Sequence, residues 1–254
     1  MRQAMRVLCL IVFAGLMTAC TTEVVNPGAD LPAAAEANAR LGLGYMNQGD
    51  YELAMGKLKK ALRFDEENAN AHHYLGELNR ILGENKAADE HFKKALQLKP
   101  GDSSLINNYG VFLCDTEQYA EAKGYFNRVL NDPLYRDKPR IYENLALCAQ
   151  RKGNLSEAEL SYRKALRLEP RLPKSLLAMA QLSFDQRQAL NAYAFYQRYI
   201  EINAQTSQSL WLGILLERDR GNHDKAASYA LLLKRKYPNS KETGLLRKLE
   251  AHRG

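Results

Sequence analysis

The sequence predicts an all-α fold, a right-handed superhelical solenoid built from six helix-turn-helix repeats. Two observations lead to this prediction. Residues 41–62 (LGLGYMNQGDYELAMGKLKKAL) and 75–96 (LGELNRILGENKAADEHFKKAL) align without a gap at an offset of 34 residues. An alanine then recurs at steps of 34, 34, 36, 34 and 34 residues, at Ala54, Ala88, Ala122, Ala158, Ala192 and Ala226. A repeat of this period is typical of stacked pairs of helices.

The residue types within each repeat have physical reasons to recur. Twelve residues before the alanine stands a small residue, which lets two helices cross closely: Gly42, Gly76, Gly110, Ala146 and Ala180. Four residues after it stands a large apolar side chain on the same helix face, at Leu58, Phe92, Phe126, Tyr162 and Tyr196. Glycine marks the turn between the two helices at Gly49, Gly83, Gly153 and Gly221, where a positive φ is expected. This is the tetratricopeptide (TPR) pattern.

The chain divides into four parts on these signals. The predicted repeats span 35–68, 69–102, 103–138, 139–172, 173–206 and 207–240. Residues 1–19 read as a lipoprotein signal peptide, and residues 20–34 as a lipidated cysteine followed by a flexible tether. Residues 241–254 are expected to form a capping helix and tail, because the last repeat of a stack needs a polar outer face.

The N-terminal segment resembles a bacterial lipoprotein signal. Arg2 and Arg6 precede the apolar run Val7–Met17, which is too short to span a bilayer. The stretch LMTAC then resembles a lipobox, with Met17 where leucine is usual, and Cys20 would carry the lipid. An ordinary signal peptide with an incidental cysteine is the alternative. Removal of residues 1–19 leaves a formal net charge of +5, since two of the 36 basic residues and none of the 29 acidic ones are lost.

The distribution of charge bears on the possible ligands, and the spacing of the cysteines bears on their role. The basic excess is spread along the chain, which argues against nucleic acid as a ligand. Cys114 and Cys148 form no CxxC pair, and we interpret them as small buried apolar residues, although an exported protein could oxidise them.

No catalytic or metal-binding pattern is present in the sequence. His72 and His73 are adjacent and would point apart on a helix, and His91 is isolated. Neither a phosphate-binding loop nor a nucleophile elbow occurs. We therefore expect a protein that is not an enzyme, with no cofactor, no metal and no small-molecule substrate. Its function should reside in the concave surface that such a solenoid presents to a protein partner.

In TPR proteins the first helix of each repeat lines the concave groove through its second, fifth, ninth and twelfth positions. The predicted groove residues are Leu43, Met46, His73, Asn107, Val111, Cys114, Leu147, Leu177, Phe184, Trp211 and Leu215. Many are apolar residues that the two helices of their own repeat do not need for packing, and we expect them to form an exposed strip for a partner. The alternative is that the tether or other packing covers some of them.

A carboxylate-binding clamp is not expected in this groove. Chaperone-binding TPR domains use Lys, Asn, Asn, Lys and Arg, whereas this chain supplies His73, Glu77, Asn108, Arg140 and Asn144. Glu77 would repel a carboxylate. An amphipathic helix or an extended apolar segment is the expected ligand.

The whole chain resembles the type IV pilus pilotin lipoproteins, the PilF/PilW family. The most specific stretches are residues 107–122 (NNYGVFLCDTEQYAEA), 132–147 (DPLYRDKPRIYENLAL), which hold the two-residue insertion, and 226–238 (AASYALLLKRKYP). The resemblance implies an outer-membrane lipoprotein facing the periplasm of a Gram-negative bacterium, anchored through Cys20. It further implies binding to the pilus secretin through the N-terminal repeats near Leu43 and Met46, and a role in pilus biogenesis and twitching motility. Another periplasmic TPR lipoprotein, such as a barrel-assembly scaffold or a protease adaptor, is the alternative.

Overall fold

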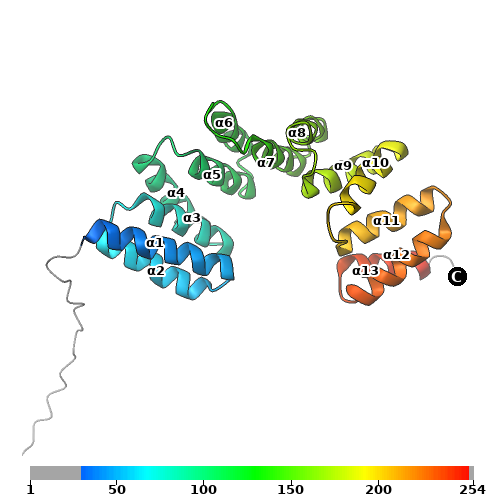
Figure 1. Ribbon diagram of the computed structural model, residues 1–254, viewed down its shortest axis with the longest axis horizontal. Helices are drawn as coiled ribbons and strands as arrows, with labels where there is room; N and C mark the ends of the chain where they lie inside the picture. The colour runs from blue at the N-terminus through cyan, green and yellow to red at the C-terminus, as the bar shows by residue number, and fades with distance from the viewer. Residues whose placement is uncertain (1–29, 252–254) are drawn as a thin grey trace, which may run out of the picture.

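The computed structural model describes residues 30–251, which form an arch of α-helices without any strand in that range (Figure 1). The helices are α1 (Leu31–Gln48), α2 (Tyr51–Phe64), α3 (Ala69–Leu82), α4 (Asn85–Leu98), α5 (Ser103–Asp115), α6 (Tyr119–Leu130), α7 (Lys138–Arg151), α8 (Leu155–Leu168), α9 (Pro173–Asp185), α10 (Ala189–Ile200), α11 (Ser207–Asp219), α12 (His223–Lys236) and α13 (Lys241–Ala251). The predicted all-α TPR solenoid is confirmed. Cys20 and the predicted signal peptide lie outside the described residues.

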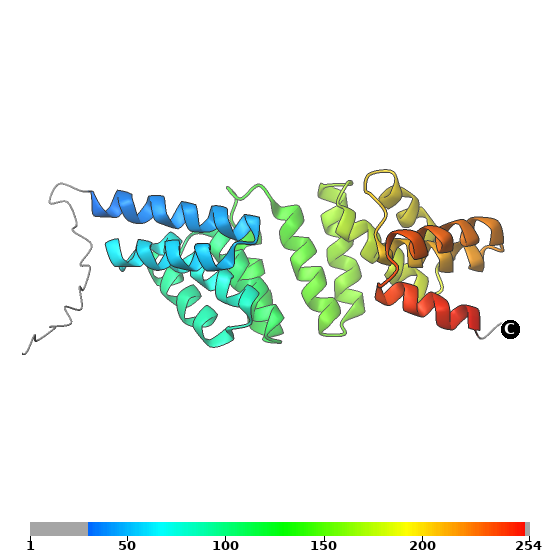
Figure 2. The same cartoon turned by 90° about the horizontal axis from the view of Figure 1, so that it is seen from below.

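Each repeat is an antiparallel pair, and the pairs stack side by side along the arch. In Figure 1 the helices α3, α5, α7 and α9 follow the inner side of the arch, while α6, α8 and α10 lie on its outer side. Seen at right angles in Figure 2, the stack is elongated and the first and last helices lie at opposite ends. The first helices of successive repeats therefore line one continuous concave face.

The first helix begins earlier than the repeat pattern predicts. α1 starts at Leu31, four residues before the predicted start of repeat one, because local capping favours it there. The Asp30 side chain accepts a hydrogen bond from the Ala33 amide at 3.1 Å, and Pro32 lies in the first turn, where its missing N–H costs nothing. Residues 31–34, expected in the tether, are thus helical.

Helix crossings are tight at the small residues that the repeat pattern singled out. A Cβ added to Gly110 would lie 2.9 Å from Cε1 of Phe126, and one added to Gly76 would lie 2.9 Å from the ring of Phe92. Ala122 is completely buried beside them. The four predicted turn glycines all have positive φ, as expected, and Glu117 and Arg187 take the same backbone conformation in repeats three and five.

Cys114 and Cys148 form a disulfide between α5 and α7, with their Cα atoms 5.6 Å apart. Both residues are buried, as expected, at 4% and 3% exposure, and the oxidation that the sequence left open is the state the structure shows. The two cysteines are 34 residues apart, and residues about one repeat apart lie on adjacent stacked helices. The separation of 34 residues was therefore the sequence signal that could have predicted the disulfide.

The two ends of the stack are built differently. At the C-terminal end, α13 packs against α11 and α12, and its Leu246 joins Leu210, Ile214 and Leu233 in a buried cluster. At the N-terminal end, no described element covers α1 and α2 on the side away from α3. None of the helices within residues 30–251 is long and apolar enough to cross a bilayer.

Candidate partner-binding groove

The predicted groove residues lie on the first helices of the repeats, but their exposure varies widely. Leu147 of α7 is the most accessible apolar member, with 43% of its surface exposed. His73 of α3 is only 7% exposed. Cys114 of α5 is 4% exposed and is held in the disulfide, so it offers no contact to a partner. The remaining predicted members are half-buried: Leu43, Met46, Asn107, Val111, Leu177, Phe184, Trp211 and Leu215.

Most of the apolar groove residues also pack between repeats. Met46 contacts the cluster built around Leu58 and Leu75, and Trp211 contacts the cluster at the C-terminal end. Val111, Leu177 and Phe184 pack in the same way against the clusters of the central and later repeats. For these five residues the alternative left open by the sequence therefore applies, since packing against the hydrophobic clusters covers part of the expected strip. Leu43, Leu147 and Leu215 belong to no such cluster.

A chain of polar side chains crosses the floor of the groove from repeat four to repeat two. Asn144 of α7 donates to Asn107 Oδ1 at 2.9 Å, and Asn107 donates to Asn108 Oδ1 at 3.1 Å. Asn108 Nδ2 lies 2.9 Å from His73 Nε2. Burial lowers the pKa of His73 to about 4, so its imidazole is neutral and can accept this bond.

A row of charged side chains runs beside this chain of polar residues, across the same repeats two to four. Glu77 and Arg80 pair at 3.1 Å, Arg80 reaches Asp115 at 2.8 Å, and Asp115 also pairs with Arg151. Burial raises the pKa of Glu77 even though Arg80 opposes the shift. Since His73, Asn108, Asn144 and Glu77 are all engaged with one another or with neighbours, these positions offer no ready clamp for a carboxylate.

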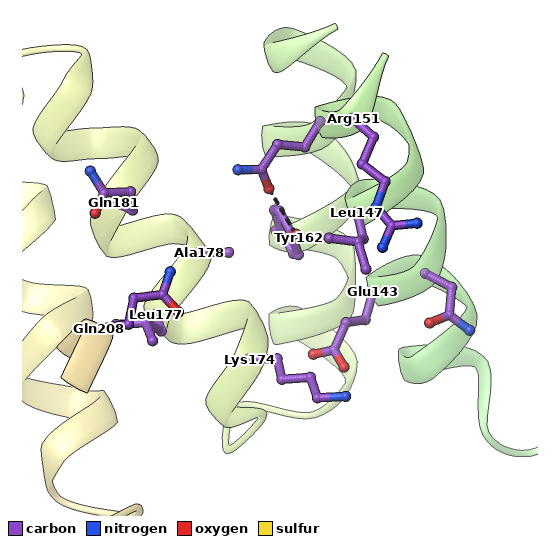
Figure 3. A pocket seen from close by; sticks show the side chains of 11 residues that line it. Glu143, Leu147, Arg151, Tyr162, Lys174, Leu177, Ala178, Gln181 and Gln208 are labelled. Atoms are coloured by element: carbon purple, nitrogen blue, oxygen red, sulfur yellow. Dashed lines mark hydrogen bonds between the residues drawn. The ribbon is translucent and has the colours of Figure 1, made fainter. Parts of the chain in front are cut away.

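The concave face contains a pocket of about 410 Å³ at repeats four and five, which Figure 3 shows from close by. Leu147 of α7 and Leu177 of α9 stand on opposite walls, with Tyr162 of α8 at the back. The pocket is completed by Glu143, Asn144, Gln150, Arg151, Lys174, Ala178, Gln181 and Gln208. Apolar walls with a polar rim suit one or two side chains of a peptide whose backbone bonds to the rim.

Hydrogen bonds hold the buried polar groups of this pocket in place. Glu143 accepts from the Ser175 amide at 3.1 Å and from the Ser175 hydroxyl at 2.6 Å. The Tyr162 hydroxyl donates to Gln150 Oε1 at 3.1 Å. Burial, reinforced by the charge of Glu143, raises the pKa of Tyr162 to about 12. Lys174 is exposed and has no ion-pair partner among the described residues, so its charge is available to a ligand.

One histidine pair lies away from the groove. His91 is not isolated as predicted, because its Nδ1 lies 2.9 Å from Nδ1 of His72 across the α3–α4 pair. The Glu66 carbonyl accepts from the other ring nitrogen of His72 at 3.0 Å. Within residues 30–251 no group of three or more His, Cys, Asp or Glu side chains is arranged to hold a metal ion.

Family models match the repeats directly. A model described as TPR repeat matches residues 42–80, and a tetratricopeptide repeat model matches residues 69–102. Residues 115–235 match the model of the middle TPR-like domain of cilia and flagella-associated protein 70.

A curated relative covers most of the chain. The type IV pilus assembly protein PilF of Pseudomonas aeruginosa is 37% identical over 209 residues, which are 82% of this chain and 83% of the relative. This chain belongs to the PilF family. The structure of P. aeruginosa PilF is similar with a TM-score of 0.76 and 35% identity, over 87% of this chain and 99% of that one. The crystal structure of PilW, a widely conserved type IV pilus biogenesis factor, is similar with a TM-score of 0.75 and 28% identity, over 84% of this chain and 97% of that one.

Membership in the PilF family places the chain among the TPR proteins of type IV pilus biogenesis. TPR solenoids mediate protein–protein interactions through their extended concave surfaces. The groove of this PilF family member is thus the surface on which its partners should be sought.

Proposed function

We propose that this protein is an outer-membrane lipoprotein, anchored through Cys20 with its repeats in the periplasm, that binds the type IV pilus secretin. Binding promotes localisation and multimerisation of the secretin, and hence pilus biogenesis and twitching motility. The observation that carries the proposal is the match to PilF, which extends over more than four fifths of both chains rather than over isolated repeats. The lipobox-like stretch ending at Cys20 supports the anchor.

The protein acts as a scaffold and not as an enzyme, and its groove receives an amphipathic helix or an extended apolar segment of the secretin. The N-terminal part of the groove offers Leu43 of α1, which packs in no interior cluster and is half-buried. Apolar side chains of the partner that cover Leu43 gain about 25 cal/mol for each Å² of apolar surface removed from water. A charge at this position would be buried without a partner and would oppose binding.

The decisive experiment compares Leu43→Glu with Leu190→Glu, a change on the exposed side of α10 where the leucine is 85% exposed. We expect Leu43→Glu to abolish secretin multimers and twitching while its melting curve stays close to that of the wild type. Leu190→Glu should leave both intact. Normal multimers in the Leu43→Glu strain would refute the N-terminal site.

A third variant, Leu147→Glu, tests whether the pocket at repeats four and five contributes to secretin binding. If only Leu147→Glu loses multimers, the binding segment lies in this later part of the groove. Detergent pull-down from membranes with mass spectrometry identifies the partner directly. Recovery of a barrel-assembly protein or a protease in place of the secretin would overturn the proposed function.

A further inference from the structure

The N-terminal end of the stack presents a face that every later repeat buries. Leu41 of α1 is 51% exposed. The residues at the equivalent position of repeats two to five, Leu75, Tyr109, Leu145 and Met179, are at most 8% exposed. Leu75 packs with Leu58 of the preceding repeat, and Tyr109 packs with Phe92. Among residues 30–251 no repeat precedes that of Leu41, and its side chain is therefore open to solvent.

α2 contributes a second stripe to the same face. Leu53, Lys57, Lys60 and Phe64 follow one another at helical spacing, on the side of α2 opposite to Met55, which faces α3 and α4. Leu53 is 52% exposed, and Lys60 Nζ lies 5.5 Å from the centroid of the Phe64 ring. The charged residues of this stripe are basic, with no acidic side chain among them. We define the end face as Ala37, Leu41, Leu53, Lys57, Lys60 and Phe64.

We propose that the end face docks on the anionic lipid surface of the membrane that holds Cys20. Apolar side chains flanked by lysines are what such a surface attracts, since the former enter the headgroup region and the latter meet lipid phosphates. The opposite end of the stack does not require a covering surface of this kind, because α13 already covers it. This inference rests on the proposed anchoring through Cys20.

The length of the tether brings the end face to the membrane. α1 begins at Leu31, so the ten residues 21–30 separate it from Cys20, and the eleven steps between the two Cα atoms span at most about 40 Å. The root-mean-square end-to-end distance of a random-coil chain with this number of steps is roughly 20 Å. The anchor therefore holds the end face at a high effective concentration at the lipid surface, and a contact too weak to bind a free protein suffices to orient an anchored one.

Docking by the end face determines how the arch is oriented relative to the membrane. The first repeat rests on the membrane and the later repeats extend away from it, so the concave groove stays open to partners in the periplasm. The proposed secretin contact at Leu43 lies on another side of α1 than Leu41, because residues two positions apart point in different directions on a helix, and both contacts can form together.

The test uses the lipidated protein in vesicles of phosphatidylethanolamine and phosphatidylglycerol. An environment-sensitive dye is attached at Ala37→Cys on the end face, or at Leu190→Cys on α10 as the matched control. The native Cys114 and Cys148 are joined, so the introduced thiol is labelled selectively. Brominated lipids should quench the dye severalfold more strongly at position 37 than at position 190. The excess should vanish in Lys57→Glu/Lys60→Glu and in neutral phosphatidylcholine vesicles.

Failure of the docking and failure of the anchor give different results. Intact mass of the same sample reports the acyl chains on Cys20, and their absence would overturn the anchor on which the inference rests. Acylated protein with equal quenching at the two positions would overturn the docking and leave the anchor standing. Concentration-dependent dimers that are abolished by Leu41→Gln would assign the end face to a second copy of the chain and overturn lipid docking.

Discussion

Cys114 and Cys148 join α5 to α7 through a disulfide, across the boundary between the third and fourth repeats. This boundary carries the two-residue insertion that sets its period at 36 residues in place of 34. The stacking of neighbours is the only contact that repeats of a solenoid make, so a covalent link at one boundary stabilises the whole array. A disulfide also suits an oxidising compartment such as the periplasm.

Removal of the disulfide should destabilise the fold. The double variant Cys114→Ala/Cys148→Ala frees a loop of 34 residues in the unfolded chain, and we expect unfolding free energy to fall by about 2–4 kcal/mol. Urea denaturation followed by circular dichroism measures it. Reductant should shift the wild-type midpoint and leave the double variant unchanged. A wild type that is indifferent to reductant would contradict the disulfide.

Two glycine-to-alanine changes should act in opposite directions. Gly110→Ala places a methyl group 2.9 Å from the Phe126 ring and should lower stability, because the buried crossing of α5 and α6 must open. Gly124→Ala, in the middle of α6 with nothing within 4 Å of the new methyl group, should raise stability by about 0.5–1 kcal/mol. Thermal melting of both variants checks the prediction, and a stabilised Gly110→Ala would show that the two helices cross elsewhere.

Overpacking the same crossing from the other helix should also be costly. Ala122 is completely buried, and Ala122→Leu forces extra methylene groups into the interface at a cost of about 1–3 kcal/mol. Ala120→Leu, two residues earlier on the exposed side of α6, is the control and should melt near the wild-type temperature. Equal melting temperatures for the two variants would mean that the helix register is wrong.

His73 should make stability depend on pH below about 6.5. Burial lowers its pKa to about 4 in the fold, with Lys99 acting in the same direction and Asp102 opposing, while the unfolded chain keeps the ordinary value of 6.5. The unfolded state therefore binds a proton first, and the stability present above pH 6.5 is lost as pH falls toward 4. Between pH 7 and 4.5 the loss due to this residue is about 2–3 kcal/mol.

Urea titrations at the two pH values, for the wild type and for His73→Gln, isolate this contribution from that of the other titrating groups. The variant should lose less stability on acidification than the wild type does. His223→Gln, at the exposed start of α12, is the control and should follow the wild type. Parallel losses in wild type and His73→Gln would mean that His73 is not buried in solution.

Two neighbouring groove positions should respond differently to charge. Met46→Lys should lower the melting temperature markedly, because Met46 packs against the cluster of Leu58 and Leu75. Leu43→Glu should have little effect, since Leu43 lies outside that cluster. The comparison by thermal melting decides whether Leu43→Glu is a clean test of partner binding. A large loss for Leu43→Glu would assign Leu43 to the core.

The repeat pattern was sufficient to predict the paired helices, the tight crossings at Gly76 and Gly110 and the turn glycines, because each depends on residues close in sequence or on a recurring spacing. It was not sufficient for the exposure of the groove. Met46 and Trp211 occupy groove positions like Leu147, yet Met46 packs against the cluster of Leu58 and Leu75, and Trp211 packs against the cluster of α11, α12 and α13. How deeply a groove side chain is covered depends on the size of the side chains that the adjacent helices present, and that differs from repeat to repeat.

The sequence by itself determined the architecture and the number of repeats, since a period of 34 residues with small and large residues at set positions admits few other folds. The resemblance of particular stretches to the PilF/PilW family, and not the period, indicated pilus biogenesis. Only the tertiary structure decided which distant side chains meet. The disulfide, the polar chain from Asn144 to His73 and the pocket between Leu147 and Leu177 each join residues from different repeats. These contacts follow from the rotation of each repeat against the next. Many packing contacts together determine that rotation, and no single motif encodes it.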